Sequence, residues 1–388
     1  NKMYRSIILT VFTTGITILS VAQTKEDSLK VKEIGEVSII GGNGKKIPGS
    51  GEAISAETLS KMNQTDVNKV LRNVPGVNIR DEEGFGLRPN IGLRGTPVNR
   101  SAKITLMEDG ILIAPAPYAD PSAYYFPTFA RMQGVEVLKG SSQIKYGPYT
   151  IGGAVNLLST AIPNSFKGLI QANYGSFGTN QQHIWIGDSQ KNFDYVFEVN
   201  RIASNGFKEL YSDNNLLGFK KFFHDRNTGF DRRDFSGKVR WHTKANAKVP
   251  QSLTFKFVRS EETGNETYLG LTYDDFQANP LRRYAGTQKD ILDMNHSHFT
   301  LSHIISPTKS MNITTTAYLS ETFRDWARAN SFGGQSINGI LSDPTTNETG
   351  YMIMTGQANG NINYRSAART YNSKGVQTSA NQHFKTGN

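Results

Sequence analysis

The feature that most constrains this chain is a two-residue periodicity that begins near residue 167 and recurs in several long segments. Residues 193–199 and 299–303 alternate in this way, and the clearest example sets Phe235, Gly237, Val239 and Trp241 against Ser236, Lys238, Arg240 and His242. Successive side chains of a strand point to opposite faces, so each segment places one face in an apolar setting and the other in water. We therefore predict strands of roughly ten residues, the length that a tilted strand of a membrane barrel needs.

The connections between these segments alternate in length. Residues 188–192, 244–251 and 306–310 are short and turn-like, whereas residues 204–231, 260–295 and 322–350 are long. Short turns on one rim and long loops on the other are the organisation of an outer-membrane β-barrel. Residues 260–295 hold three Lys or Arg against seven Asp or Glu, so the loop surface is not a simple cationic funnel.

Composition agrees with strands that face lipid on one side and water on the other. Aromatic residues make up 10% of the 388 residues and glycine contributes 37, yet the mean hydropathy is only −0.45. The chain has no cysteine, which excludes disulfides, thiolate metal sites and a lipid-bearing cysteine. Its net charge of +10 is spread out, without the compact basic cluster or recognition helix of a nucleic-acid-binding protein, so no nucleic-acid partner is expected.

The first 22 residues have the layout of a secretory signal peptide. Arg5 precedes an apolar run over residues 7–19, which ends in Ser20-Val21-Ala22. The alternative is a membrane anchor, but this run is short for a hydrocarbon core of about 30 Å. We expect export of the mature chain.

Residues 23–45 read as a flexible tract that contains one β-prone segment. That segment comprises Ile34, Gly35, Glu36, Val37, Ser38, Ile39 and Ile40. It lies between charged and glycine-rich flanks, so it cannot bury itself locally and suits a strand that adds to the sheet edge of a partner protein. An ordinary first strand is the other interpretation.

Residues 46–162 are predicted to form a compact mixed α/β domain. Residues 55–71 show helical spacing of apolar side chains, and Asp66 is a candidate cap for a second helical turn. Short strands are expected at residues 76–79, 91–95, 104–107, 134–138 and 154–158.

Six blocks in this region resemble the plug domains of TonB-dependent outer-membrane receptors. They are residues 71–77 (LRNVPGV), 90–95 (NIGLRG), 106–111 (LMEDGI), 135–140 (VEVLKG), 146–148 (YGP) and 152–156 (GGAVN). Six blocks in the right order are far more specific than one short motif. Within the family the resemblance is to the ferric citrate receptors, whose apical plug loop is similar to residues 114–121 (APAPYADP).

The resemblance implies a fold and a mechanism. The fold is a mixed α/β plug domain inside a transmembrane antiparallel β-barrel of 22 strands, of which residues 167–388 supply about eight to ten. The implied location is the outer membrane of a Gram-negative bacterium. Residues 34–40 then become the TonB box, which pairs with TonB and so couples the receptor to the inner-membrane energising complex. The transported ligand is a ferric siderophore or citrate chelate, and no permanently bound cofactor or metal is expected.

The resemblance also carries over four ligand-binding residues. Arg94 matches the arginine of the "I-R-G" strand, and Asp120 stands where the ferric citrate receptor has a ligand-contacting glutamine. Arg282 and Arg283 lie in the second long loop, where that receptor also has arginines. A guanidinium can pair with a carboxylate of a citrate chelate through two parallel hydrogen bonds, whereas Asp120 would repel an anionic chelate.

Two departures from the family pattern concern the whole chain. Eight to ten strands alone would leave unpaired edges in lipid, and residues 384–388 lack the terminal aromatic residue that usually closes such barrels. We expect the chain to be part of a longer reading frame.

Rival functions have little support in the sequence. It contains no nucleophile elbow, phosphate-binding loop or His-Glu-x-x-His motif, so we do not expect an enzyme. His296 and His298 share a polar strand face, which favours a polar lumen over haem ligation, and His303 lies on the opposite face. Ferric citrate, other siderophores, haem and cobalamin all remain open as ligands, and a surface-binding barrel without transport is the second class.

Overall fold

The computed structural model describes residues 50–113, 124–140, 143, 151–211, 228–244, 246–267, 269–382 and 384. All of them belong to one compact unit, residues 35–388. The predicted signal peptide, the predicted TonB box and Asp120 lie outside the described residues. No helix among the described residues is long and apolar enough to cross a membrane.

The first part of the fold is a small sheet with two short helices. Its strands run in the order β1-β6-β7-β4-β5, with β4 and β7 parallel and the other pairs antiparallel. The bounds are β1 Ser50–Ile54, β4 Ile104–Glu108, β5 Ile111–Leu112, β6 Met132–Lys139 and β7 Gly153–Ser159. A separate hairpin joins β2 Val77–Arg80 to β3 Asn90–Leu93. β2, β3, β4, β6 and β7 confirm the predicted positions within a few residues, whereas β1 and β5 were not predicted.

The helices of this part are α2 Ala56–Met62 and α3 Val67–Leu71. Asp66 caps α3 as predicted, because its Oδ1 accepts a hydrogen bond of 2.8 Å from the backbone N–H of Asn68. Val67, Val70 and Leu71 are fully buried in a core built from β3, β4, β6 and β7. The helix is held by this apolar contact, since five residues are too few to be stable alone.

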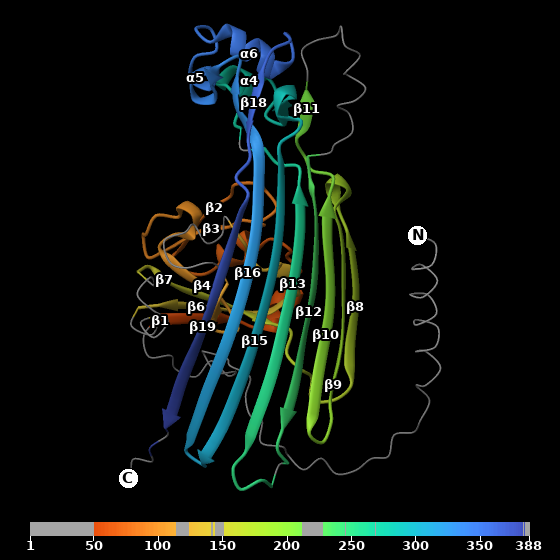
Figure 1. Cartoon of the computed structure of the whole chain (residues 1–388), viewed down its shortest axis with the longest axis vertical. Coiled ribbons are helices and arrows are strands. Elements are labelled where there is room, and N and C mark those ends of the chain that lie inside the picture. Colours follow the sequence, from red (N-terminus) through yellow and green to blue (C-terminus); the bar gives the residue numbers. More distant parts are fainter. Residues whose placement is uncertain are drawn as a thin grey trace, which may run out of the picture. The chain divides into compact units, whose positions relative to one another are not determined.

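The second part is a ten-stranded sheet whose long strands are all antiparallel to their neighbours. Its long strands are β8 Lys167–Tyr174, β9 Asn180–Ser189, β10 Phe193–Ser204, β12 Phe230–His242, β13 Gln251–Gly264, β15 Ile291–Thr308, β16 Met311–Phe332 and β19 Arg369–Gln382. The short strands β17 Gln335–Ser336 and β18 Ile362–Arg365 pair with the end of β16. Within the described residues this sheet runs from β8 to β19 (Figure 1).

Strand lengths differ from the expectation. β15 has 18 residues and β16 has 22, so they reach well into the segments expected to be loops. β16 continues to Phe332, which places the third long connection between residues 332 and 369 rather than at 322–350. Alternation weakens at Asp325 and Arg328, and polar side chains there hid the continuation of the strand.

The connections at one end of the long sheet form a cap. It contains α4 Tyr273–Ala278, α5 Ile337–Ser342, α6 Glu348–Thr355, β11 Glu209–Tyr211 and β14 Arg282–Tyr284 (Figure 1). The cap has its own hydrophobic cluster, made of Tyr284, Ala329, Phe332, Ile340, Ile353 and Met354. Asp275 ties it together, because its carboxylate accepts from the hydroxyls of Tyr284 at 2.6 Å and Tyr351 at 3.0 Å.

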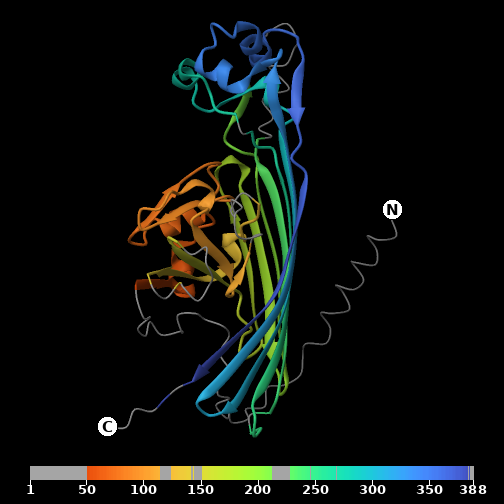
Figure 2. The same ribbon diagram turned by 60° about the vertical axis from the view of Figure 1, so that its left-hand side comes forward.

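The long sheet has its polar face buried and its apolar face exposed. The small sheet lies against one face of the long sheet (Figure 2), and that face carries Arg232, Ser236 and Lys238, each at most 7% exposed. On the opposite face, Phe235 and Trp241 are 49% and 50% exposed. This arrangement confirms the predicted alternation, and it is the polar face that packs against the plug-like domain.

Candidate functional site

A group of buried charges joins the small domain to the long sheet. Lys256 of β13 reaches across to the turn after β4, where its Nζ lies 2.7 Å from Glu108 Oε1 and 2.6 Å from Asp109 Oδ2. Arg131 donates two parallel hydrogen bonds to Glu108, at 2.9 and 2.8 Å. Glu108, Asp109, Arg131 and Lys256 are called the Glu108 cluster below. It is a charge-balanced contact between the two sheets.

Electrostatics in the Glu108 cluster favour the ionised carboxylates. Burial alone would raise the pKa of Glu108, but Arg131 and Lys256 hold it well below its usual value. Burial opposes ionisation of Asp109 as well, and Lys238 and Lys256 lower its pKa strongly. Both carboxylates therefore remain charged at neutral pH, which preserves their pairing with the lysine from the long sheet.

A second buried group lies nearer the cap. Arg88, in the hairpin loop between β2 and β3, pairs with Glu262 of β13 and donates to Glu266 at 3.0 Å. Arg232 of β12 reaches the same Glu262 at 3.2 Å. Arg88, Arg232, Glu262 and Glu266 are called the Arg88 cluster below. It fixes the loop between β2 and β3 to the long sheet.

Tyr125 connects the two clusters. The guanidinium of Arg232 lies over the Tyr125 ring at 5.4 Å, and Arg131 donates to the Tyr125 hydroxyl at 3.3 Å. The Tyr125 ring also stacks on the ring of His296, with centroids 3.6 Å apart. A continuous series of contacts thus runs from Glu266 near the cap to Asp109 in the small domain, crossing between the two sheets.

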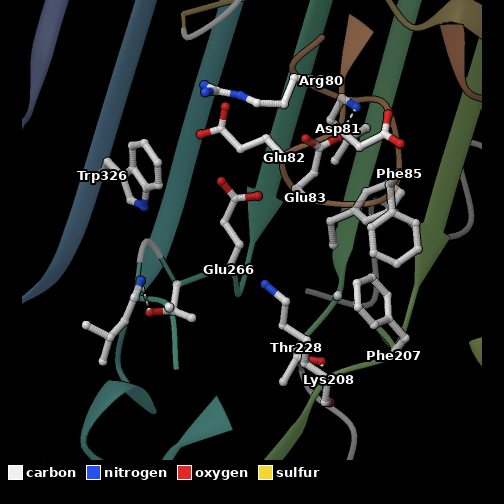
Figure 3. Close-up of a pocket in the computed structure, with 16 residues that line it drawn as sticks. Arg80, Asp81, Glu82, Glu83, Phe85, Phe207, Lys208, Thr228, Glu266 and Trp326 are labelled. Carbon is white, nitrogen blue, oxygen red and sulfur yellow. Dashed lines mark hydrogen bonds between the residues drawn. The ribbon is translucent and has the colours of Figure 1, made fainter. Parts of the chain in front are cut away.

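A cavity of about 500 Å³ opens beside the Arg88 cluster. It lies between the β2–β3 loop, the base of the cap and the end of β16 (Figure 3). Its lining residues are Arg80, Asp81, Glu82, Glu83, Phe85, Leu87, Phe207, Lys208, Thr228, Gly229, Phe230, Glu266, Thr267, Leu269, Gly270 and Trp326. A cavity of this volume suits a ligand of several rings or a small chelate.

Local backbone chemistry brings the β2–β3 loop to the cavity. Gly86 has a φ of +76°, and a Cβ there would lie 2.0 Å from Asp66 Oδ1. Only glycine therefore lets the loop pack on Asp66, the N-cap residue of α3. Glu83 then accepts hydrogen bonds through Oε1 from the backbone N–H groups of Leu87 and Arg88. The loop is therefore closed on itself before any ligand arrives.

Two carboxylates on the cavity wall are incompletely compensated. Glu83 Oε2 is buried and has no hydrogen-bond partner, and burial raises the pKa of Glu83. Burial also raises the pKa of Glu266, although Arg88 opposes the shift. In Figure 3 Lys208 extends into the same space, and burial lowers its pKa. Glu83 therefore contrasts with the carboxylates of the Glu108 cluster, each of which has a cationic partner within 3 Å.

One side of the cavity is aromatic. Phe85 of the β2–β3 loop packs against Phe207, in the connection between β10 and β11, and against Phe230 of β12, with ring centroids 5.6 and 5.0 Å apart. Trp326 of β16 stands at another side of the cavity (Figure 3). The cavity thus offers apolar ring faces next to charged groups, a combination that holds ligands with both kinds of surface.

The structure places Arg94 away from this cavity. β3 ends at Leu93, so Arg94 is a turn residue with a φ of +55° rather than a strand residue, and its side chain is exposed. It lies near Gly140 at the end of β6. The Thr96 N–H closes the turn by bonding to the carbonyl of Leu93 at 3.1 Å, and the Arg94 N–H bonds to the carbonyl of Gly76 at 2.9 Å. Its ligand contact stays a prediction.

Arg282 and Arg283 are engaged inside the cap. Arg282 donates to Asp275 at 2.8 Å. Arg283 is only 2% exposed, and its guanidinium donates to the hydroxyl of Thr287 and to the carbonyl of Asn265. Burial lowers the pKa of Arg283 to about 10. Neither arginine lines the cavity, and both hold the cap in shape.

His296 and His298 lie side by side on the buried face of the sheet, where they bond to Thr322 and Ser320. His303 lies apart from them and bonds to Gln251. Within the described ranges, no three His, Asp or Glu side chains are grouped to hold a metal ion.

Glu83, Phe85 and Glu266 were missed from the sequence. A signal existed in the run Asp81-Glu82-Glu83-Gly84-Phe85-Gly86, because a loop that mixes charge, an aromatic side chain and glycines between two strands is typical of a binding loop. The approach of Glu266, which lies 178 residues after its partner Arg88, had no local signal.

Comparison with known proteins identifies the first domain. Residues 43–154 match the family described as TonB-dependent Receptor Plug Domain. Among curated proteins, the "Vitamin B12 transporter BtuB" of Vibrio vulnificus (strain YJ016) is 28% identical over an alignment of 179 residues that covers 42% of this chain and 28% of that protein.

Solved structures share the fold of both parts. The ferric citrate transporter FecA in the unliganded form has a TM-score of 0.62 at 17% identity, covering 87% of this chain and 45% of that one. The ferric-catecholate import receptor Fiu from E. coli K12 gives 0.60 at 15% identity, covering 88% and 47%. The siderophore receptor PiuA from Acinetobacter baumannii gives 0.57 at 16%, covering 88% and 43%. The chain thus spans about a quarter to a half of the length of these relatives.

Proposed function

We propose that this chain, which carries the plug domain and adjoining barrel strands of a TonB-dependent receptor, serves the uptake of an iron chelate across the outer membrane of a Gram-negative bacterium. The observation that carries the proposal is the cavity between the plug loop at residues 81–88 and the base of the cap. A ligand there touches the plug and the long sheet together, which is what a ligand-gated plug requires.

The contacts around the cavity supply a route from ligand to plug. The side chain of Arg88 projects from the plug loop at the cavity wall. It pairs with Glu262 of the long sheet and with Glu266 of the adjoining loop. A ligand that draws Glu266 toward itself weakens one of those pairs, and the remaining contacts lead through Arg232 and Tyr125 to the Glu108 cluster. Ligand binding can therefore shift the population of plug positions.

In this proposal the energy for transport is supplied by a partner protein, TonB. Residues 34–40 act as the TonB box and add as a strand to the sheet of TonB, which transmits work from the inner-membrane energising complex. No step is assigned to ATP or to a covalent intermediate on this chain. The proposed role is that of a transporter rather than an enzyme.

The TonB-box assignment can be tested with a proline variant. In Ile39→Pro the segment loses a backbone donor in its centre, so uptake should be abolished while ligand binding persists. Ser28→Pro, in the preceding polar tract, is the matched control and should transport normally. Unchanged uptake by the Ile39→Pro receptor would refute the assignment.

Iron chelates are preferred as the ligand class because FecA, Fiu and PiuA are described as a ferric citrate transporter, a ferric-catecholate import receptor and a siderophore receptor. Cobalamin is the second candidate, favoured by the identity with BtuB. Ferric citrate itself suits the cavity less well, because its lining holds four Asp or Glu against two Lys or Arg, which disfavours a polyanion.

Growth of a strain deleted for the gene separates these ligands. Under iron limitation it is supplied in turn with ferric citrate, a ferric hydroxamate or a ferric catecholate, and a second culture depends on external cobalamin. Loss of growth on one iron source, restored by the gene, supports iron uptake and names the chelate. Loss only in the cobalamin culture moves the assignment to cobalamin, and growth in every culture contradicts uptake of either class.

A further inference from the structure

The cavity lining holds more carboxylates than cations. Asp81, Glu82, Glu83 and Glu266 line it, against Arg80 and Lys208. Three of these carboxylates have an arginine within 4 Å, because Arg72 pairs with Asp81, Arg100 with Glu82 and Arg88 with Glu266. Among the described residues, Glu83 is the lining carboxylate without such an ion pair, and a buried carboxylate attracts a cation under such conditions.

One acceptor is also left unused. Glu83 is 9% exposed, and its Oε2 has no hydrogen-bond partner, although Oε1 is held by the loop backbone. A buried carboxylate oxygen without a donor destabilises the structure, because it has lost its water and gained no hydrogen bond in return. Glu83 belongs to the cavity lining, so a donor brought in by a ligand can supply the missing hydrogen bond.

We propose that the ligand of this cavity carries a positively charged nitrogen group, an ammonium or a guanidinium, which donates to Glu83 and Glu266. Its apolar part packs on the wall formed by Phe85, Phe207 and Phe230. This inference rests on the proposed function and narrows it from iron chelates in general to those with a cationic arm. The lysine at the wall does not reverse this preference, since Lys208 faces both Glu83 and Glu266 and is already included in the charge count.

A matched set of chelates tests the charge directly. The probes are a ferric trihydroxamate with one free primary ammonium, the same chelate N-acetylated, and the same chelate with the amine succinylated to a carboxylate. Binding to the complete purified receptor is measured by titration calorimetry. We expect affinity to fall by about tenfold from the ammonium to the acetylated form, because a charge-assisted hydrogen bond is lost. The carboxylate form should bind most weakly.

The variant Glu83→Gln locates the effect. Glutamine keeps an Oε1 that accepts from Leu87 and Arg88, so the loop is retained while the charge is removed. The preference for the ammonium form should shrink to about twofold or less. Glu57→Gln removes the same charge from the exposed surface of α2, where Glu57 pairs only with Lys61 in the described structure, and should keep the full preference.

An iron-free pair keeps this inference separate from iron transport. 2-Phenylethylammonium and its N-acetyl derivative carry the same ring and differ in charge. Binding of the ammonium probe that depends on Glu83 supports the inference even where no ferric chelate is taken up, which would contradict only the iron assignment. Uptake of ferric chelates without preference for the ammonium form, or a preference that persists in Glu83→Gln, overturns the inference and leaves iron uptake intact.

Discussion

The Glu108 cluster and the cavity wall are both buried and both contain carboxylates, but they are compensated differently. Glu108 and Asp109 have Arg131 and Lys256 at hydrogen-bond distance, and their pKa values lie well below the usual range. Glu83 has an unused oxygen, and burial raises its pKa. The comparison teaches that the first region holds the plug against the long sheet, whereas the second is incomplete without a ligand.

The largest expected effect comes from breaking the compensated region. Glu108→Gln leaves Arg131 and Lys256 buried with one fewer counter-charge, so we expect a loss of about 3–5 kcal/mol in the free energy of local opening. Native-state hydrogen exchange at the amides of β4 and β7 in the complete protein measures this loss. Exchange as slow as in the wild type would show that this pairing does not hold the plug.

Arg88→Met should have the next largest effect. The substitution removes the ion pairs of the plug loop with Glu262 and Glu266, but Glu262 keeps Arg232. The expected loss in the free energy of local opening is therefore about 1.5–3 kcal/mol. Hydrogen exchange of residues 81–88 should quicken while β4 remains protected. Equal loosening of both regions would show that the two clusters open together.

Acidification should act on the two regions in opposite directions. The lowered pKa values of Glu108 and Asp109 mean that their stabilisation is present above about pH 4 and is lost as the pH falls through the lowered values, by roughly 1–3 kcal/mol. The raised pKa of Glu83 means that its ionisation penalty disappears as the pH falls through the raised value toward its ordinary range. Hydrogen exchange in both regions between pH 7 and pH 3.5 provides the test. Parallel loosening of the two regions would contradict the comparison.

Glu83→Gln should have the smallest effect on stability. It removes an uncompensated charge and keeps the acceptor for the loop, so the ligand-free receptor should change by less than about 1 kcal/mol, toward higher stability. Urea unfolding of the plug measures this change, with Glu108→Gln as the matched substitution. A large loss from Glu83→Gln would mean that its second oxygen is compensated after all.

Local chemistry made much of the fold predictable. Asp66 caps α3 as its residue type predicts, and the alternation of Phe235 with Ser236 placed the long strands and their two faces. The six blocks of plug-like sequence located the first domain, and the family match over residues 43–154 agrees with them.

The candidate site was less predictable for a physical reason. The cavity depends on pairs such as Arg88 with Glu262, which lie 174 residues apart and leave no periodic trace in the sequence. The arginines inferred by resemblance carry the right charge for an anionic chelate, but Arg94 lies in a turn and Arg283 is buried in the cap. Position in a motif did not encode the direction of the side chain.

The two faces of the long sheet have a consequence for how the chain reaches its fold. Hydrophobic collapse in water would gather Phe235, Trp241 and Phe255 inside and leave Ser236 and Lys238 outside, the reverse of what is observed. Water is thus a poor medium for assembling this sheet, and an apolar surface has to be offered to the nascent strands while the plug domain covers their other face. An unfolded chain returned to buffer alone should aggregate through these strands, whereas the same chain given detergent micelles should recover the pairing of β12 with β13.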